Sequence, residues 1–137
     1  MVAVRTMGEV AHGRQPLVVQ AQETVLEAVR RMVAAGKAAV LVMEQGRLVG
    51  IFTEHDLLNR VMTEGRDPRA VQVSEVMTSP VVTVRPDLSY QEGLRRMEEA
   101  DVRYLVLMDG DQLAGMVSRR DLMASDIEVV EEMLRRI

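Results

Sequence analysis

The sequence has no cysteine and very few aromatic residues. Among its 137 residues there are no Cys, no Trp, one Phe and two Tyr. The absence of cysteine excludes disulfides, thiolate catalysis and cysteine-ligated metal sites. With so few aromatic rings, the core has to be built from Val, Leu, Ala and the eleven Met, whose flexible side chains fill irregular spaces.

Long apolar runs are also missing. No stretch approaches the roughly twenty apolar residues that cross a bilayer, and the first residues, MVAVRTMGEVAHGRQ, lack the apolar run of a signal peptide. The net charge of −4 gives no overall attraction to nucleic acid or to an anionic membrane. We therefore expect a soluble, cytoplasmic protein that binds neither nucleic acid nor membrane.

What the sequence does contain is an internal repeat with an offset of 65 residues. The segment Gly50–Leu57 (GIFTEHDL) recurs as Gly115–Leu122 (GMVSRRDL). The same shift places Arg30–Met32 on Arg95–Met97, and no gap is needed from Leu17 to Leu57. Chance is a poor explanation for a match of this length.

Each copy predicts the same series of elements: a leading strand, a helix opened by a capping box, two buried strands joined by a hairpin turn, and a second helix. The fold class is therefore α/β (α+β), with the unit β-α-β-β-α written twice. The predicted elements, first copy then second, are the leading strands Leu17–Val19 and Val81–Val84, the capping boxes Thr24–Glu27 and Ser89–Glu92, the middle strands Ala38–Met43 and Arg103–Met108, the last strands Leu48–Phe52 and Leu113–Val117, and the helix starts Thr53 and Ser118.

These elements divide the chain into a first repeat at residues 1–63, a linker at 64–72, a second repeat at 73–124 and a C-terminal helix at 125–137. Gly36 is the expected stop of the first helix. The linker is placed on the polar stretch TEGRDPR, which contains Gly and Pro. The capping box Ser125–Glu128 predicts that a new helix begins there.

An apolar stripe with helical spacing runs along this C-terminal segment, and two interpretations are about equally supported. The stripe either packs on its own domain or forms a contact between two copies of the chain. Its residues are Met123, Ile127, Val130, Leu134 and Ile137.

Two such units in tandem, each ending in Gly-hydrophobe-hydrophobe-Ser/Thr-x-x-Asp-Leu, resemble a pair of CBS (cystathionine β-synthase) domains, also called a Bateman module. The resemblance covers almost the whole chain. The opening of the second copy, Val73–Thr78, is similar to the usual start of this domain, whereas Met7–Gly13 matches it only loosely.

The resemblance implies a sensor rather than a catalyst. It implies two repeats packed with pseudo-twofold symmetry, two clefts between them, and an adenosine-containing ligand: AMP, ADP or ATP first, with S-adenosylmethionine and NAD as further candidates. It also implies that the motif aspartate holds the ribose, that the Ser/Thr assists with phosphate, and that the modules pair into a homodimer. No cofactor is required, and the regulated protein partner is unknown.

The chemistry of the motif agrees with that role. Asp56 and Asp121 each stand three residues after a hydroxyl residue, Thr53 or Ser118, at a predicted helix start. A carboxylate accepts hydrogen bonds from both hydroxyls of a ribose, and a helix start favours phosphate. The same residues would cap a helix with no ligand present; the doubled motif and the resemblance favour a nucleotide site, with capping as a second role.

The two copies differ beside the motif aspartate. The second copy has Arg119 and Arg120, whose guanidinium groups can bind phosphate oxygens, where the first copy has Glu54 and His55. Glu54 would repel phosphate, and His55 gains charge only below neutral pH, so the first site either binds weakly or prefers a less charged adenosine compound. We therefore expect the Asp121 site to bind a phosphorylated ligand better than the Asp56 site; a solvated surface pair is the alternative interpretation of the two arginines.

Further candidates are weaker. Arg103 and Tyr104 open the middle strand of the second copy, where the resemblance places residues near the ligand, although core packing explains Tyr104 better than a contact with adenine. Thr78, Ser79 and Pro80 either line the pocket or form only the turn that enters a strand.

No catalytic triad, glycine-rich phosphate loop or activated carboxylate pair is found in the sequence, and the only histidines, His12 and His55, lack metal-site spacing. We therefore do not expect an enzyme. The alternative to a nucleotide sensor is a structural or adaptor module that dimerises and holds no physiological nucleotide.

Overall fold

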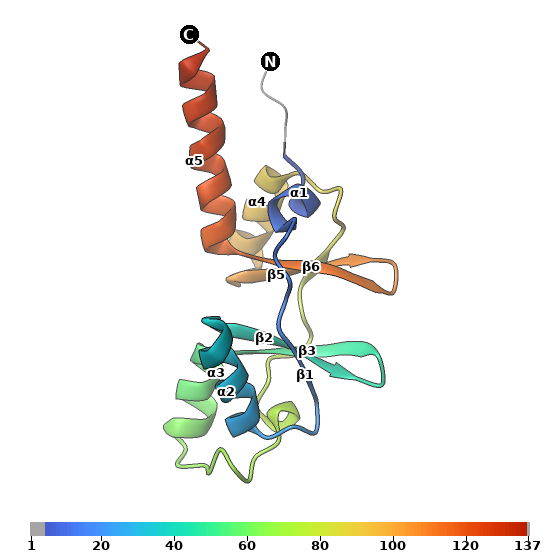
Figure 1. Ribbon diagram of the computed structural model, residues 1–137, viewed down its shortest axis with the longest axis vertical. Coiled ribbons are helices and arrows are strands. Elements are labelled where there is room, and N and C mark those ends of the chain that lie inside the picture. The colour runs from blue at the N-terminus through green and yellow to red at the C-terminus, as the bar shows by residue number, and fades with distance from the viewer. Residues whose placement is uncertain (1–4, 137) are drawn as a thin grey trace. The chain divides into compact units, whose positions relative to one another are not determined.

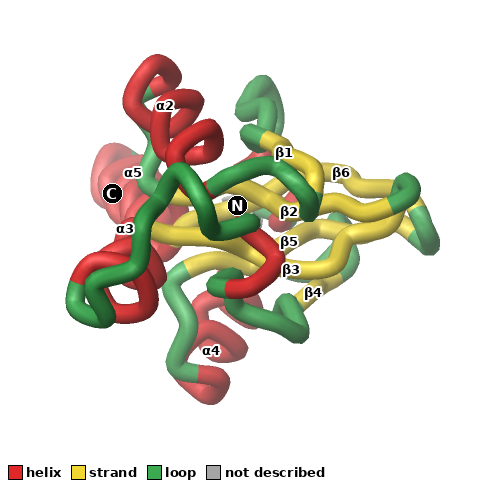
Figure 2. Tube along the Cα trace, turned by 90° about the horizontal axis from the view of Figure 1, so that it is seen from below, coloured by secondary structure: helices red, strands yellow, loops and turns green. Residues whose placement is uncertain are grey.

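The computed structural model describes residues 5–136, which form two compact units (Figure 1). We call residues 16–81 the Asp56 unit and residues 5–15 with 82–136 the Asp121 unit. Each unit contains one three-stranded sheet with its helices on one face. Figure 2 shows the strands of both sheets in yellow. The mixed α+β class with a repeated β-α-β-β-α unit is confirmed.

The Asp56 unit has the sheet order β1-β2-β3, with β1 and β2 parallel and β2 and β3 antiparallel. A short helix follows β3 and continues as a π-helical turn, and a 3-10 turn comes later in the chain. The elements are β1 (Val18–Gln20), α2 (Val25–Ala35), β2 (Ala39–Glu44), β3 (Arg47–Thr53), α3 (Glu54–Asp56), the π-helical turn Leu57–Met62 and the 3-10 turn Val73–Glu75.

The Asp121 unit repeats this topology with the order β4-β5-β6. Its distinguishing features are a helix ahead of the first strand and a long last helix. The elements are α1 (Met7–Ala11), β4 (Thr83–Val84), α4 (Tyr90–Ala100), β5 (Tyr104–Asp109), β6 (Gln112–Ser118) and α5 (Arg119–Arg135).

Local sequence signals account for most element ends. The hydroxyls of Thr24 and Ser89 each accept a hydrogen bond from the amide three residues on, at 3.2 Å. Helix α2 ends at Gly36, as expected, in the left-handed conformation that glycine adopts at no steric cost. The expected reciprocal half was wrong for both boxes: neither glutamate accepts from the amide of its capping residue, and the carboxylate of Glu92 pairs with Arg95 at 2.6 Å instead.

Each sheet carries its own hydrophobic core on the face covered by the helices. In the Asp56 unit Val40, Val42 and Phe52 are fully buried, and in the Asp121 unit Leu105, Leu107 and Val117 take the same places. Because a buried strand carries a near-continuous apolar run, both middle strands were visible in the sequence. The core is mainly aliphatic, as the shortage of aromatic residues requires.

The segment that precedes each copy in the sequence packs in the unit that holds the other copy's sheet. In the Asp121 unit the amide of Met7 donates to Leu88 O at 2.7 Å, and in the Asp56 unit the amide of Val73 donates to Glu23 O at 2.8 Å. Residues 64–72 also belong to the Asp56 unit, where Val71 is buried. Each unit thus contains the sheet of one copy and the segment that precedes the other copy in the sequence.

The expectation that a new helix begins at Ser125 was wrong, because α5 runs without interruption from Arg119 to Arg135. Ser125 is only 6% exposed and packs inside the unit. No glycine or proline lies between these ends, so nothing in the chain stops the helix. None of the helices in the described part of the chain is long and apolar enough to cross a membrane.

Candidate functional site

Both motif aspartates lie where the last strand of a sheet turns into a helix. Thr53 ends β3 and caps α3, and Ser118 ends β6 and caps α5. In both places the capping box is reciprocal: the hydroxyl accepts from the aspartate amide, and the carboxylate accepts from the amide of the hydroxyl residue. The predicted capping role is therefore confirmed for both motifs.

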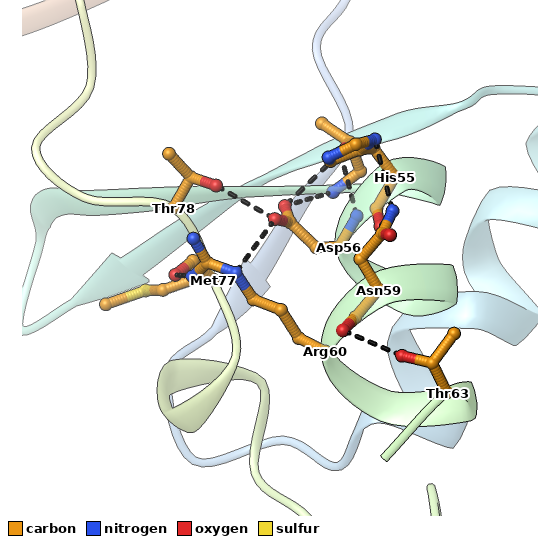
Figure 3. Close-up of polar contacts among 8 residues, drawn as sticks. His55, Asp56, Asn59, Arg60, Thr63, Met77 and Thr78 are labelled. Carbon is orange, nitrogen blue, oxygen red and sulfur yellow. Dashed lines mark hydrogen bonds and ion pairs between the residues drawn. The ribbon is translucent and has the colours of Figure 1, made fainter.

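The carboxylate of Asp56 is closed in by its own unit (Figure 3). The residue is only 2% exposed. Its Oδ2 accepts from the Thr53 amide at 3.0 Å and from the Thr53 hydroxyl at 3.2 Å, while its Oδ1 accepts from the Thr78 hydroxyl at 2.9 Å. Arg60 Nε lies 3.6 Å from the same Oδ1. Both oxygens of this buried carboxylate are thus satisfied by protein groups.

The main chain and a methionine complete this enclosure. Thr78 pairs with Ile51 of β3 through two backbone hydrogen bonds, and the guanidinium of Arg60 donates to Met77 O at 2.8 Å. The Met77 side chain lies against Gly50: a Cβ built on that glycine would stand 2.3 Å from Met77 Sδ. The segment 77–78 therefore packs along the middle of β3, at Gly50 and Ile51, and reaches Asp56 through the Thr78 hydroxyl.

His55 and Glu54 are both exposed and make no contact with the Asp56 carboxylate among the bonds of the described chain. The His55 ring lies 3.2 Å from the side-chain nitrogen of Asn59, which also donates to His55 O at 2.9 Å (Figure 3). His55 is thus part of a local helix-surface contact.

The carboxylate of Asp121 is more open. Its side chain is 20% exposed, ten times the exposed fraction of Asp56. Oδ2 accepts from the Ser118 amide at 2.9 Å, and Oδ1 is ion-paired with Arg14 Nη1. Arg14 is itself half exposed. One oxygen of Asp121 therefore accepts a hydrogen bond from the motif itself. The other is held by an exposed ion pair, a kind of interaction that contributes little to stability.

Three more arginines come from the same end of the Asp121 unit. Arg119 and Arg120 form the first turn of α5, and the Arg119 amide donates to Arg103 O at 2.8 Å, where β5 begins. All three side chains are exposed, and none has an ion pair or side-chain hydrogen bond within residues 5–136. Tyr104 pairs with Ser118 across β5 and β6 and is partly buried.

The expected pocket residues Thr78, Ser79 and Pro80 are placed in the Asp56 unit. Thr78 reaches Asp56, while Ser79 and Pro80 are exposed. The sequence interpretation missed Arg14, whose side chain pairs with Asp121 Oδ1 in the other unit. The opening segments of the two copies align with an offset of 66 residues, one more than the offset of the repeat itself. In this alignment the reciprocal capping box Gln72–Glu75 matches the box Thr6–Glu9. That shift pairs Pro80 with Arg14.

The same alignment explains why the two sites differ in openness. It places Met77 on Ala11, and a Cβ built on Gly115 would meet only the Ala11 methyl, at 3.2 Å. A methyl group thus replaces a methionine side chain against the middle of β6. No group of three His, Cys, Asp or Glu side chains that could hold a metal occurs in the described residues.

A family model for the CBS domain matches the chain twice, over residues 7–63 and 73–128. The chain belongs to the CBS domain family. The "CBS domain-containing protein YhcV" of Bacillus subtilis is 33% identical over 108 residues, which are 79% of this chain and 76% of that protein. Other curated relatives are longer, and the chain spans only 17% of one of them.

Solved structures of the CBS family have the same fold. A CBS-domain protein from Burkholderia ambifaria, proposed to act in signal transduction, is 34% identical with a TM-score of 0.80 and covers 85% of each chain. A hexameric CBS-CP12 protein from bloom-forming cyanobacteria is 26% identical with a TM-score of 0.79, covering 98% of this chain and 88% of that one. CBS domains commonly bind small-molecule ligands and oligomerise, and stand-alone members are generally non-catalytic.

Proposed function

We propose that this tandem CBS protein is a regulatory sensor that binds an adenosine-containing ligand, with AMP, ADP or ATP as first candidates, at Asp121. The observation that carries the proposal is the contrast between the two motif aspartates. Asp121 is 20% exposed, with one oxygen in a surface ion pair, whereas Asp56 is 2% exposed with both oxygens bonded inside the unit.

The groups around Asp121 suit a nucleotide. The carboxylate can accept both hydroxyls of a ribose, and the first turn of α5 and its two arginines supply positive charge for phosphate. Arg103 lies at the same end of the sheet, because its carbonyl accepts the Arg119 amide. Ala11 lies beside Gly115 of β6 where Met77 lies beside Gly50 of β3, so a smaller side chain packs against the strand in this unit.

The Asp56 site is expected to remain empty of phosphorylated ligand. A ribose there would have to break the Thr78 bond to a buried carboxylate and displace Met77. Leaving a buried polar group without its partner is costly. Glu54 would add repulsion toward phosphate. We therefore expect one nucleotide for each chain.

Signalling follows from differential affinity. A ligand that binds one arrangement of the module more tightly than another shifts the population toward it, and a partner protein or a second copy of the chain reads the change. The relevant oligomer is a homodimer in this proposal, and no catalytic step is assigned.

The test is a thermal-shift and calorimetry series with AMP, ADP, ATP, NAD and S-adenosylmethionine on protein cleared of bound nucleotide. Asp121→Asn and Asp56→Asn are the matched variants, since asparagine removes the charge but keeps a side-chain oxygen that can accept from the amide of Ser118 or Thr53. We expect stabilisation by at least one adenine nucleotide, lost in Asp121→Asn and kept in Asp56→Asn. The opposite pattern would assign the ligand to the Asp56 site, and no binding in any variant would overturn the proposal.

A second candidate is an adaptor that acts through α5. This helix leaves an apolar face exposed: Met123 is 52% exposed, Ile127 59% and Leu134 63%. A second copy of the chain is the partner we consider, because CBS domains commonly oligomerise. The discriminating measurement is analytical ultracentrifugation of Ile127→Glu. If Ile127→Glu were monomeric and still bound nucleotide with unchanged affinity, α5 would be the contact between two copies and nucleotide binding would not depend on that contact.

A further inference from the structure

The two oxygens of the Asp121 carboxylate have different kinds of partner. Oδ2 accepts from the Ser118 amide at 2.9 Å and belongs to the helix cap. Oδ1 is paired with the Arg14 guanidinium. In the Asp56 unit the corresponding Oδ1 accepts from the neutral hydroxyl of Thr78, at 2.9 Å. A flexible cation thus occupies the one Asp121 oxygen that capping leaves available.

A ligand can displace Arg14 from Asp121 at a small cost in free energy. Arg14 follows α1, where its amide donates to Ala11 O at 3.0 Å, so its main chain is anchored. Its side chain is 50% exposed, and within residues 5–136 Asp121 is its one ionic partner. A half-exposed ion pair contributes little net free energy. A ligand can therefore replace it without disturbing the fold.

From this geometry we propose that Arg14 is a charge-sensitive latch on Asp121, which makes the site select phosphorylated nucleosides over unphosphorylated ones. The inference rests on the proposed function and adds a specificity-determining residue from outside the repeated motif. A ribose hydroxyl that donates to Asp121 Oδ1 displaces the Arg14 guanidinium. The guanidinium then has no anionic partner unless the ligand supplies one.

The phosphate of a nucleotide meets that need. Arginine binds phosphate oxygens in a bidentate manner, so a nucleotide replaces the ion pair that it breaks. A nucleoside without phosphate breaks the same ion pair but supplies no anion to which Arg14 can bind. Arg14 therefore opposes adenosine and favours AMP, whereas an arginine that only touches phosphate would favour AMP and leave adenosine unaffected.

The experiment compares adenosine with AMP by isothermal titration calorimetry on three proteins: the unmodified chain, Arg14→Gln and the control Arg120→Gln. In Arg14→Gln we expect adenosine to bind about two- to fivefold more tightly, from the typical strength of an exposed ion pair, and AMP to bind more weakly. In Arg120→Gln we expect weaker AMP binding and unchanged adenosine binding, because Arg120 has no bond to Asp121.

Salt provides a second readout. Raising the ionic strength screens the latch, so adenosine affinity should rise with salt in the unmodified chain and stay constant in Arg14→Gln. If AMP binds but adenosine affinity is the same in both proteins, the latch is overturned while the nucleotide site stands. If neither compound binds any of the three folded proteins, the proposed function fails together with the latch.

Discussion

The two copies of the repeat have the same hydroxyl-x-x-aspartate motif, yet they use its carboxylate in different ways. In the Asp56 unit the carboxylate is buried and bonded to Thr78, with Arg60 close by. In the Asp121 unit it is partly exposed and ion-paired with Arg14. The motif itself is equally well formed in both. The difference comes from the segment that packs beside the motif, so the motif alone is a poor guide to which copy binds a ligand.

The largest expected difference between the copies is in stability. Asp56→Ala should lower the free energy of unfolding by about 3 kcal/mol, because it removes a buried carboxylate and leaves the Thr53 amide and the partly buried Thr78 hydroxyl without their acceptor. Asp121→Ala should cost only about 1 kcal/mol, because the Ser118 cap stays and only the bond to the Ser118 amide and a half-exposed ion pair are lost.

Urea denaturation followed by circular dichroism measures both losses. Thr78→Val is the matched control, since it removes the bond to Asp56 and keeps the carboxylate, and its cost should lie between the other two. Equal losses for the two alanine variants would mean that the enclosed and the open carboxylate do not differ energetically.

The covering of Gly50 by Met77 gives a second, smaller contrast. Gly50→Ala should destabilise the Asp56 unit by about 2 kcal/mol, since its new Cβ would lie 2.3 Å from Met77 Sδ and 3.1 Å from Thr78 O. In a chain that already carries Met77→Ala, the substitution Gly50→Ala should cost about 1 kcal/mol less, because the new Cβ no longer clashes with the methionine sulfur.

Gly115 is the matched position in the Asp121 unit and should behave differently. Its φ of +155° is one that residues with a side chain rarely adopt. Gly115→Ala should therefore destabilise through backbone strain, and Ala11→Gly should not relieve it. A double-mutant cycle with urea denaturation measures both couplings. Equal relief in the two units would contradict the distinction between side-chain crowding and backbone strain.

Sequence reasoning succeeded where the determining interactions are local. The caps at Thr53 and Ser118, the stop at Gly36 and the middle strands depend on neighbours a few residues apart, and all were predicted. The ion pair of Arg14 with Asp121 joins residues 107 positions apart. No periodicity or capping rule reports such a contact.

The error at Ser125 has the opposite origin. Ser125–Glu128 is a good local signal for a helix start, but Ser125 lies on the buried face of a helix that has already begun at Arg119. Tertiary packing then decides the conformation, because the helix continues without a break against α4. Local capping signals are reliable only where the chain is free to enter the helix at that residue.

The smallest predicted effect concerns the contact that joins α4 to α5. The Tyr90 hydroxyl donates to Asp126 Oδ1 at 3.0 Å, and the corresponding residue of the first copy is Val25, which has no hydroxyl. Burial, and then the hydrogen bond to the Asp126 carboxylate, raise the pKa of Tyr90 above its usual value. Tyr90→Phe should therefore lower the free energy of unfolding at pH 8 by about 1 kcal/mol.

The raised pKa also sets the pH dependence. An unfolded tyrosine ionises near pH 10, whereas folded Tyr90 keeps its proton to higher pH, so its contribution is complete below about pH 10 and is lost as the pH rises through the folded pKa. Urea midpoints at pH 8 and above pH 10 should fall more steeply for the unmodified chain than for Tyr90→Phe. Tyr104→Phe, which removes the other tyrosine, should retain the drop due to Tyr90. If Tyr90→Phe kept the full drop, the loss of stability at high pH would have its origin outside the contact between α4 and α5.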